Sequence, residues 1–320
     1  MMQIVLVGLG AGAASAVLFA SIASGSLLSI VLFYLAPLPI MIAAIGWSHW
    51  SALIAALAAG LGLAVTFNSL FFFIAFMVGI GLPAWWLGYL GLLARVDENG
   101  NVEWYPAGRI VLWCAAIAAA MVIIAIPNFG LDEEQFRAGL RSAFERVLQE
   151  QGRGAATTPL DINSESTKRM IDLLVTLMPL AAAVLATVTN SMNLYLAGRV
   201  VKVSNRLRRP WPDLSDIRFP AAAHAAFATA LVVSFLPGLI GSVGGVIAAA
   251  LMMAYGLLGL AVVHAITRAS SGRTLILTGT YLAIFLIGWP IIVLTLLGVA
   301  DAIFDFRGRV GAGKPPALTQ

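Results

Sequence analysis

Charged residues and cysteine are both scarce in this chain of 320 residues. Only 11% of the residues are Asp, Glu, Lys or Arg, whereas a soluble domain carries about 25%. The single cysteine, Cys114, lies inside an apolar run, which excludes an internal disulfide and a multi-cysteine metal site. The sequence is therefore typical neither of a soluble domain nor of a small disulfide-stabilised one.

Catalytic and metal-binding motifs are missing as well. The sequence has no glycine-rich phosphate loop with a lysine, no His-Glu-x-x-His motif and no nucleophile elbow. Its three histidines lie far apart, and no run of carboxylates falls inside an apolar segment. We therefore expect no enzyme activity, no cofactor and no metal, and an enzyme acting on lipids is the weakest alternative.

Hydrophobic residues make up 60% of the chain, and its mean hydropathy is +0.94. Apolar runs of about 20 residues, long enough to cross the hydrocarbon core of a membrane, recur throughout. The runs are continuous rather than alternating, which excludes a β-barrel. The first run has no basic flank, so we interpret it as a span and not as a cleaved signal peptide. The sequence predicts an all-α, polytopic transmembrane bundle of eight or nine helices, at about 3–23, 27–46, 50–66, 69–94, 108–126, 171–197, 222–240, 243–267 and 275–300.

Basic residues lie in the loops and set the predicted orientation. The net charge of +4 suits an anionic cytoplasmic leaflet better than a nucleic acid. Ten Lys and Arg residues fall in three loops, with two in 95–109, six in 199–218 and two in 268–273. A cytoplasmic N-terminus places all three loops inside, so we expect a multi-pass inner-membrane protein with that orientation.

The last apolar run, 275–300, carries Gly288, Trp289 and Pro290 near its middle, where proline breaks a helix. As a ninth full span, this run would place the basic tail outside, against the charge rule. As a re-entrant pair of half-helices, it would return the tail to the cytoplasm. The sequence is compatible with both.

A long polar loop interrupts the apolar runs and is predicted to lie outside. Its segment "LDEEQFRAGLRSAFERVLQEQG" places apolar residues on one helical face, which predicts an amphipathic helix at 132–151. This helix either lies on the membrane or lids the bundle, or it is a solvated connector. We divide the chain into an N-terminal membrane bundle, this extracytoplasmic loop, a C-terminal membrane bundle and a flexible tail, at 1–126, 127–170, 171–306 and 307–320.

Small residues recur every fourth position in the first span, at Gly8, Gly12, Ala16 and Ala20. In lipid, such a stripe lets two helix backbones approach closely. The stripe is therefore either an internal packing face of the bundle or a docking face for another membrane protein.

A few polar and aromatic groups fall at membrane depth. Asn190 and Asn193 share a helix face and need hydrogen-bond partners there, either between helices or in a ligand. Trp85 and Trp86 could line a ligand cavity or pack against lipid. These four residues are the candidate ligand-binding residues.

Two acids end the last apolar run. Asp301 and Asp305 are spaced one helical turn apart, and Arg309 follows four residues later. The spacing predicts a pair between Asp305 and a nearby arginine, with Arg309 in reach, that fixes where the helix ends. The alternative is a functional pair of acids.

Three stretches of the chain together form a distinctive pattern. They are "YLAPLPIMIAAIGW" at 34–47, "GLLGLAVVHAITR" at 256–268 and "LLGVADAIFDFRGR" at 296–309. This pattern resembles that of the DUF2232 (YybS-like) family of bacterial polytopic membrane proteins. The residues that carry the resemblance are Pro37, Pro39, Gly259, Leu260, Ala261, His264, Gly298, Asp301, Phe304, Asp305, Phe306 and Arg307.

The resemblance implies a bacterial inner membrane, and the family is distantly similar to the S components of energy-coupling-factor transporters. In those proteins a small-residue stripe on the first helix docks on a transport partner, and the stripe from Gly8 to Ala20 matches it. This chain differs from them by two or three extra spans, by its long loop and by the lack of a vitamin-site motif.

Two functions are compatible with the sequence. The first is an S-component-like subunit that binds or transports a small solute or lipid-like ligand, with the bilayer and other membrane subunits as partners. The second is a membrane scaffold or assembly factor without a transported substrate. A cavity lined by Trp, Asn and Tyr side chains would favour the first, and a solid bundle would favour the second. The sequence does not identify the ligand, and nucleic acid is not an expected partner.

Overall fold

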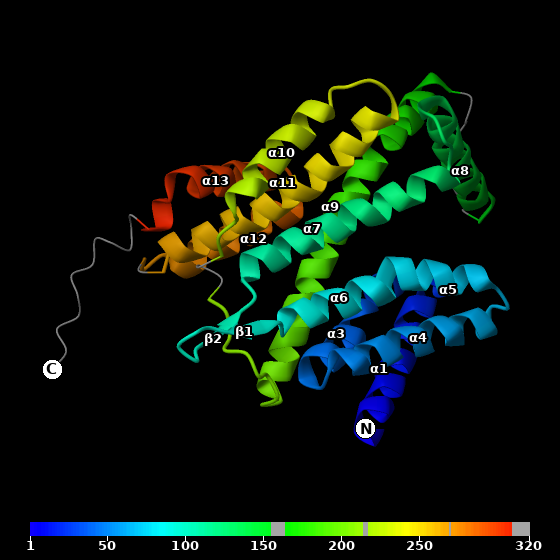
Figure 1. The fold of residues 1–320 in the computed structure, drawn as a ribbon. Helices are drawn as coiled ribbons and strands as arrows, with labels where there is room; N and C mark the ends of the chain where they lie inside the picture. Colours follow the sequence, from blue (N-terminus) through cyan, green and yellow to red (C-terminus); the bar gives the residue numbers. More distant parts are fainter. Residues whose placement is uncertain (155–163, 214–216, 269, 309–320) are drawn as a thin grey trace.

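The computed structural model describes residues 1–154, 164–213, 217–268 and 270–308. Almost all of its regular structure is helical, so the predicted all-α polytopic fold is confirmed (Figure 1). In the first part of the chain the helices are α1 Met2–Ala20, η1 Ser21–Ser24, α2 Leu27–Tyr34, α3 Pro37–Gly46, α4 His49–Thr66, α5 Leu70–Phe76, the π-helical η2 Met77–Gly81 and α6 Leu82–Gly91.

A short antiparallel hairpin follows α6, with β1 at Ala94–Val96 and β2 at Val102–Trp104. All of this hairpin except Ala94 lies within the first of the three basic loops, 95–109. The remaining helices are α7 Ala107–Ala125, η3 Ile126–Asn128, α8 Glu133–Gly154, α9 Glu165–Val203, α10 Ala221–Val233, α11 Gly238–Ile266, α12 Arg273–Ile287 and α13 Pro290–Phe304.

Seven helical stretches among the described residues are long and apolar enough to cross a membrane. The predicted spans at 222–240 and 275–300 instead give shorter helices. Helix α10 ends at Val233 because a turn before Pro237 and Gly238 (φ +80°) interrupts it. Gly288 (φ +79°) separates α12 from α13. With 13 to 15 residues each, these helices are about 20–22 Å long, short of a hydrocarbon core of about 30 Å.

Among the described residues, two larger cores hold the membrane helices together, and a third, smaller one lies under α8. The first contains Ile40, Phe76 and Leu87 of α3, α5 and α6, with small residues of α4 between them. The second surrounds Tyr255 of α11. Helix α7 contributes to both, because Cys114 lies in the first core and Ala115 in the second. Helix α9, with 39 residues and a length of about 58 Å, runs along both groups (Figure 1).

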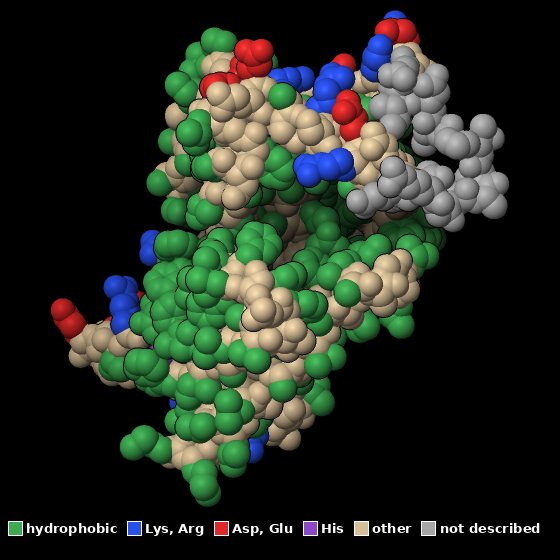
Figure 2. Space-filling model, turned by 90° about the vertical axis from the view of Figure 1, so that its right-hand side faces the viewer, with side chains coloured by type: hydrophobic (Ala, Val, Ile, Leu, Met, Phe, Trp, Pro, Cys, Tyr) green, Lys and Arg blue, Asp and Glu red, His purple; other side chains and the backbone are tan. Residues whose placement is uncertain are grey.

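The amphipathic helix predicted at 132–151 is α8, and it packs on the bundle. Phe136 and Leu140 are each 5% exposed and contact Ile171 and Val175 of α9. Arg141 forms an ion pair with Asp172 of the same helix. Charged side chains gather at this end of the molecule, above a mostly hydrophobic face (Figure 2). The contacts therefore favour the lid-like interpretation over a solvated connector.

The broken run α12–α13 returns to the side from which it starts. Arg268, just before α12, pairs with Asp213 at 2.7 Å, and Arg307, just after α13, donates to the carbonyl oxygen of Ile217 at 2.6 Å. Asp213 and Ile217 are four residues apart, so the chain can separate them by at most about 14 Å. A straight helix over 275–300 would be about 39 Å long. The geometry therefore favours the re-entrant pair over a ninth full span.

Candidate ligand-binding site

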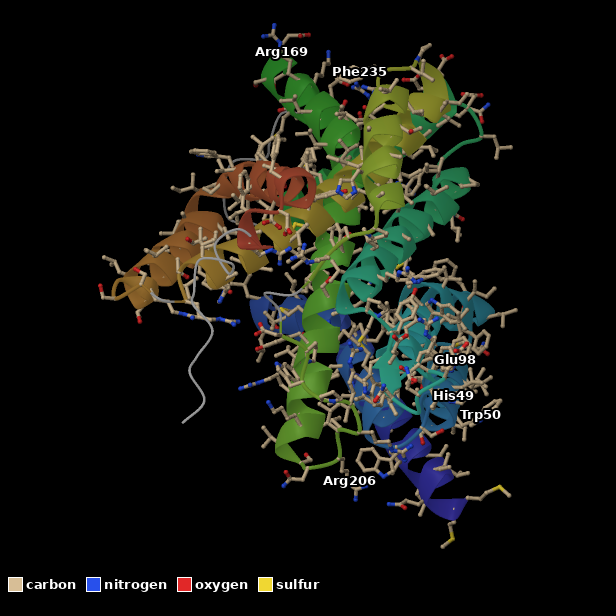
Figure 3. All side chains as sticks on the ribbon, turned by 60° about the vertical axis from the view of Figure 1, so that its left-hand side comes forward. His49, Trp50, Glu98, Arg169, Arg206 and Phe235 are labelled. Atoms are coloured by element: carbon tan, nitrogen blue, oxygen red, sulfur yellow. The ribbon has the colours of Figure 1, made fainter. Side chains whose placement is uncertain are left out.

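The three basic loops meet at one end of the bundle. Arg209 donates to the carbonyl oxygen of Gly91 at 3.3 Å, which joins the loop after α9 to the end of α6. Figure 3 places Arg206, His49 and Glu98 at this end and Arg169 at the opposite end. The loops predicted to share one side of the membrane therefore do share one end of the molecule.

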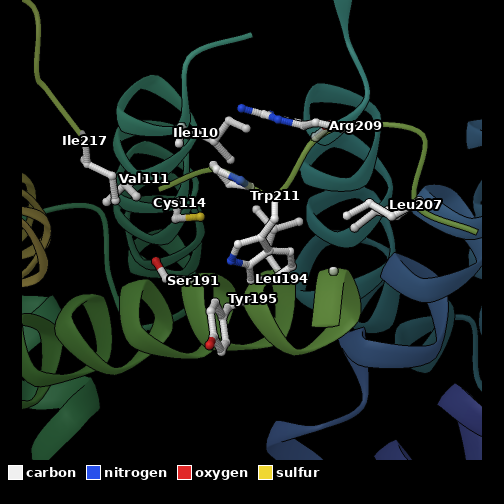
Figure 4. A pocket seen from close by; sticks show the side chains of 15 residues that line it. Ile110, Val111, Cys114, Ser191, Leu194, Tyr195, Leu207, Arg209, Trp211 and Ile217 are labelled. Atoms are coloured by element: carbon white, nitrogen blue, oxygen red, sulfur yellow. Dashed lines mark hydrogen bonds between the residues drawn. The ribbon is translucent and has the colours of Figure 1, made fainter. Parts of the chain in front are cut away.

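An apolar cavity of about 140 Å³ opens at this basic end, between α7, the second half of α9 and the segment that follows α9 (Figure 4). Its walls are almost entirely hydrocarbon. The side chains that line it are those of Ile45, Ala107, Ile110, Val111, Cys114, Ser191, Leu194, Tyr195, Leu207, Arg209, Trp211, Pro212 and Ile217, together with Gly91 and Gly198.

Trp211 forms the outer wall of the cavity and is fixed by its neighbours. Lys202 and Arg199 of α9 lie over its ring, with the charged groups 5.1 and 5.7 Å from the centroid. Such cation–π contacts hold an aromatic ring against a basic helix. Gly198 lies below the ring, where a Cβ atom would be 3.3 Å from it. An alanine at this position would have to displace the ring by a few tenths of an ångström.

Arg209 is the charged group of the cavity. Its side chain is partly buried, and within the described chain no carboxylate lies within 4 Å of it. Burial lowers the pKa of this guanidinium, because desolvation disfavours the charged form. Since arginine stays protonated in proteins, the cavity presents a positive charge that no carboxylate of the described residues pairs with.

Ser191 adds a polar group to the cavity wall. Its hydroxyl oxygen is buried beside the thiol of Cys114, which is a weak hydrogen-bond partner, and has no stronger partner among the described residues. A buried hydroxyl that is only weakly hydrogen-bonded is unfavourable. A ligand in the cavity that carried a donor or acceptor would relieve this cost.

The four residues predicted to bind a ligand do not line this cavity. Asn193 is fully buried, and its amide nitrogen donates to the carbonyl oxygens of Tyr34 and Thr189, both at 2.8 Å. It therefore links α9 to α2. Asn190 is also buried, on the same part of α9. The Asn190 amide nitrogen has no hydrogen-bond partner among the described residues. The inter-helix hydrogen bond of the alternative interpretation is therefore present for Asn193 and absent for Asn190.

Trp85 and Trp86 belong to an aromatic cluster on α6. The Trp86 ring lies 5.5 Å from that of Trp113 and 5.7 Å from that of Tyr89, and the Trp85 ring is 6.0 Å from Trp86. Sequence reasoning missed Arg209 and Trp211 instead, because they follow a span in a loop. The segment "RRPWPD" did carry a signal, since prolines flank a tryptophan beside two arginines.

The small-residue stripe of the first span faces α4. A Cβ atom on Gly12 would lie 2.6 Å from the carbonyl oxygen of Ala55, and one on Gly8 would lie 2.9 Å from that of Ser51. Ala16 and Ala20 are partly buried against the first core. The stripe is used for packing within the chain, and α4 covers its two glycines.

Apart from the two prolines of α3, the family-pattern residues lie in α11, in α13 or directly after α13. A methyl group on Gly259 would overlap the carbonyl oxygen of Leu294, and one on Gly298 would overlap that of Tyr255. The two helices therefore touch backbone to backbone. His264 of α11 hydrogen-bonds to Tyr281 of α12 at 2.9 Å.

The acids of the closing pattern each bind an arginine. Asp301 and Arg307 form a buried ion pair, with 2.8 Å between their charged atoms. Asp305 pairs with an arginine, as predicted, but this is Arg218, at 2.7 Å and far away in the sequence; Arg309 lies outside the described residues. Asp305 has a left-handed backbone (φ +49°) and ends α13.

Pro37 and Pro39 lie in the first turn of α3. Proline is tolerated there because the first backbone N–H groups of a helix have no partner within it. The proline pair therefore marks a helix start rather than a kink inside a span.

Seven span-length apolar helices, a basic end and apolar surfaces define a multi-pass, all-α integral membrane protein. The chain belongs to the DUF2232 family, described as predicted membrane proteins, whose profile matches residues 13–302. No curated protein and no solved structure matches it.

Proposed function

We propose that this protein is a membrane-embedded binding subunit for a small amphiphile with an anionic head. The apolar cavity beside Arg209 carries the proposal. An apolar tail that leaves water for the hydrocarbon walls of the cavity is stabilised by about 25 cal/mol per Å² of buried surface. A partly desolvated guanidinium without a carboxylate partner favours an anionic group at the same place.

The cavity supports a binding role over a purely structural one. A scaffold needs a solid bundle and gains nothing from a hollow, because empty space in a core costs stability. The walls include Trp211 and Tyr195, two of the aromatic types expected of a ligand site. A docking role for the first helix is not part of the proposal, because α4 covers Gly8 and Gly12.

The proposal is tested by ligand binding in nanodiscs. Dodecyl phosphate and dodecanol have the same tail, and only the first has a charge. We expect dodecyl phosphate to raise the Tm of the protein more than dodecanol does. Arg209→Gln should remove this difference, whereas Arg169→Gln, the same charge change at an exposed residue of α9 at the opposite end of the molecule, should keep it.

A second pair of variants tests the cavity itself. Val111→Phe fills it and should weaken binding of both probes, while Ala116→Phe, at an exposed position of the same helix, should not. Equal stabilisation by both probes in the wild type, or unchanged binding in Val111→Phe and Arg209→Gln, would contradict the proposal.

A further inference from the structure

A second cavity, of about 520 Å³, lies at the same basic end and has a different character. It is formed by the start of α1, the junction of α3 with α4 and the end of α6, and Arg208 closes it. Polar side chains make up a large part of its wall. They are Trp47, Ser48, His49, Tyr89 and Arg208.

One stretch of chain separates this polar cavity from the apolar one. Leu207 and Arg209 line the apolar cavity, whereas Arg208 between them lines the polar cavity. In an extended segment, successive side chains point to opposite faces. The two arginines therefore serve two different sites, and the polar cavity is independent of the proposed amphiphile site.

The wall of the polar cavity is positive and contains no acid. None of its lining residues is Asp or Glu, and Arg208 is its cation. A second cation, the guanidinium of Arg206, lies 4.6 Å from the centre of the Trp47 ring. The cavity therefore attracts anions, and no lining carboxylate neutralises it.

Hydrogen-bond donors converge on this cavity from three elements. His49 and Tyr89 lie side by side on its wall, packed edge to face with ring centroids 5.4 Å apart, and no hydrogen bond occupies the His49 ring among the described residues. Helix α4 begins at His49, and Ser48 caps it by accepting from the N–H of Trp50 at 3.2 Å. The N-terminus of this helix adds a partial positive charge to the cationic wall.

We propose that the polar cavity binds a phosphate group. The guanidinium of Arg208 can donate two parallel hydrogen bonds to two phosphate oxygens. The imidazole of His49 and the phenol of Tyr89 can donate to the other oxygens. The phosphate belongs either to a soluble phosphate ester or to a lipid headgroup, because the cavity lies at the end of the bundle where the basic loops meet.

The test uses sn-glycerol 3-phosphate as the probe and calorimetry on the full chain in phosphatidylcholine nanodiscs. We expect saturable binding that Arg208→Gln weakens by about tenfold or more, since a charge-assisted bond is lost. His49→Gln and Tyr89→Phe should each weaken it less. Lys202→Gln makes the same charge change at a residue that lines neither cavity, and it should leave binding within twofold.

Two further arms identify the source of the phosphate and separate this proposal from the previous one. Competition by phosphatidylglycerol added to the nanodiscs assigns the site to a lipid headgroup, and absence of competition assigns it to a soluble ester. Arg209→Gln should leave glycerol 3-phosphate binding intact, even if it abolishes the response to dodecyl phosphate. No binding of either phosphate form, or equal losses in Lys202→Gln and Arg208→Gln, would overturn the proposal.

Discussion

At the residue scale, the closing motif of the chain consists of two ion pairs of different kinds. Asp301 accepts from the backbone N–H of Arg307 at 3.1 Å and from its Nε at 2.8 Å, and both side chains are almost fully buried. The pair of Asp305 with Arg218 is about half exposed on each side. The hydrogen bond from Arg218 holds the pKa of Asp305 below its ordinary value. This exposed pair therefore stabilises the fold at neutral pH and is lost as the pH falls through that lowered pKa.

Removal of one partner of the buried pair should strongly lower the stability of the protein. Asp301→Ala removes the buried carboxylate that pairs with Arg307, which costs about 3–5 kcal/mol. Urea or thermal unfolding in detergent measures the loss. Asp305→Ala is the matched control and should change stability little, because its partner is exposed.

The double variant Asp301→Leu with Arg307→Leu adds a second check. It removes both charges and should be less destabilising than Asp301→Ala alone. Asp301→Ala with wild-type stability but without ligand binding would instead identify Asp301 as a functional acid.

At the scale of the elements, small residues decide which helices touch. Glycines in α1 allow contact with α4, and glycines in α11 and α13 allow a second close contact. The sequence predicted the first stripe, because its spacing of four is regular. It could not distinguish internal packing from docking on a partner, since both need the same residues. The difference depends on α4, whose place beside α1 is a property of the whole bundle.

Variants of two glycines in α1 test whether the stripe is used for internal packing. Gly12→Leu inserts bulk against the backbone of Ala55 and should destabilise the protein by about 1–3 kcal/mol or more. Gly10→Leu, at an exposed position with no atom within 4 Å of its Cβ site, should be tolerated. Melting curves of both variants measure this difference in stability. A stable Gly12→Leu protein that has lost a membrane partner would restore the docking interpretation.

The contact of α11 with α13 is tested by a second matched pair of glycine variants. Gly298→Val places two methyl groups against the carbonyl of Tyr255 and should lower the unfolding free energy by about 1–3 kcal/mol. Gly279→Val, in the exposed helix α12, meets no atom within 4 Å and should be near neutral. Similar losses in both variants would show that helix propensity, and not the contact, explains the effect.

At the scale of the whole molecule, hydropathy predicted the class of protein and most of the spans, because length and composition alone decide whether a helix can cross a membrane. It placed a full span at 222–240, where the turn before Pro237 leaves only 13 helical residues. Neither cavity was predicted. Both depend on Leu207, Arg208 and Arg209 folding back over α6 and α7, and such a long-range contact has no periodic signal in the sequence.

The sidedness of the chain is the last prediction. With the N-terminus inside, the loop 204–220, the connector before α12 and the end of α13 should all face the cytoplasm, and α8 should face outward. Single cysteines at Lys202, Ser271, Phe306 and Gln135, all exposed positions, in a Cys114→Ser background test this with an impermeant thiol reagent. We expect only the cysteine at Gln135 to be labelled from outside. Labelling at Phe306 but not at Ser271 would make α12–α13 a full span, against the contacts of Arg268 and Arg307 with the loop after α9. Labelling at Lys202 would reverse the orientation.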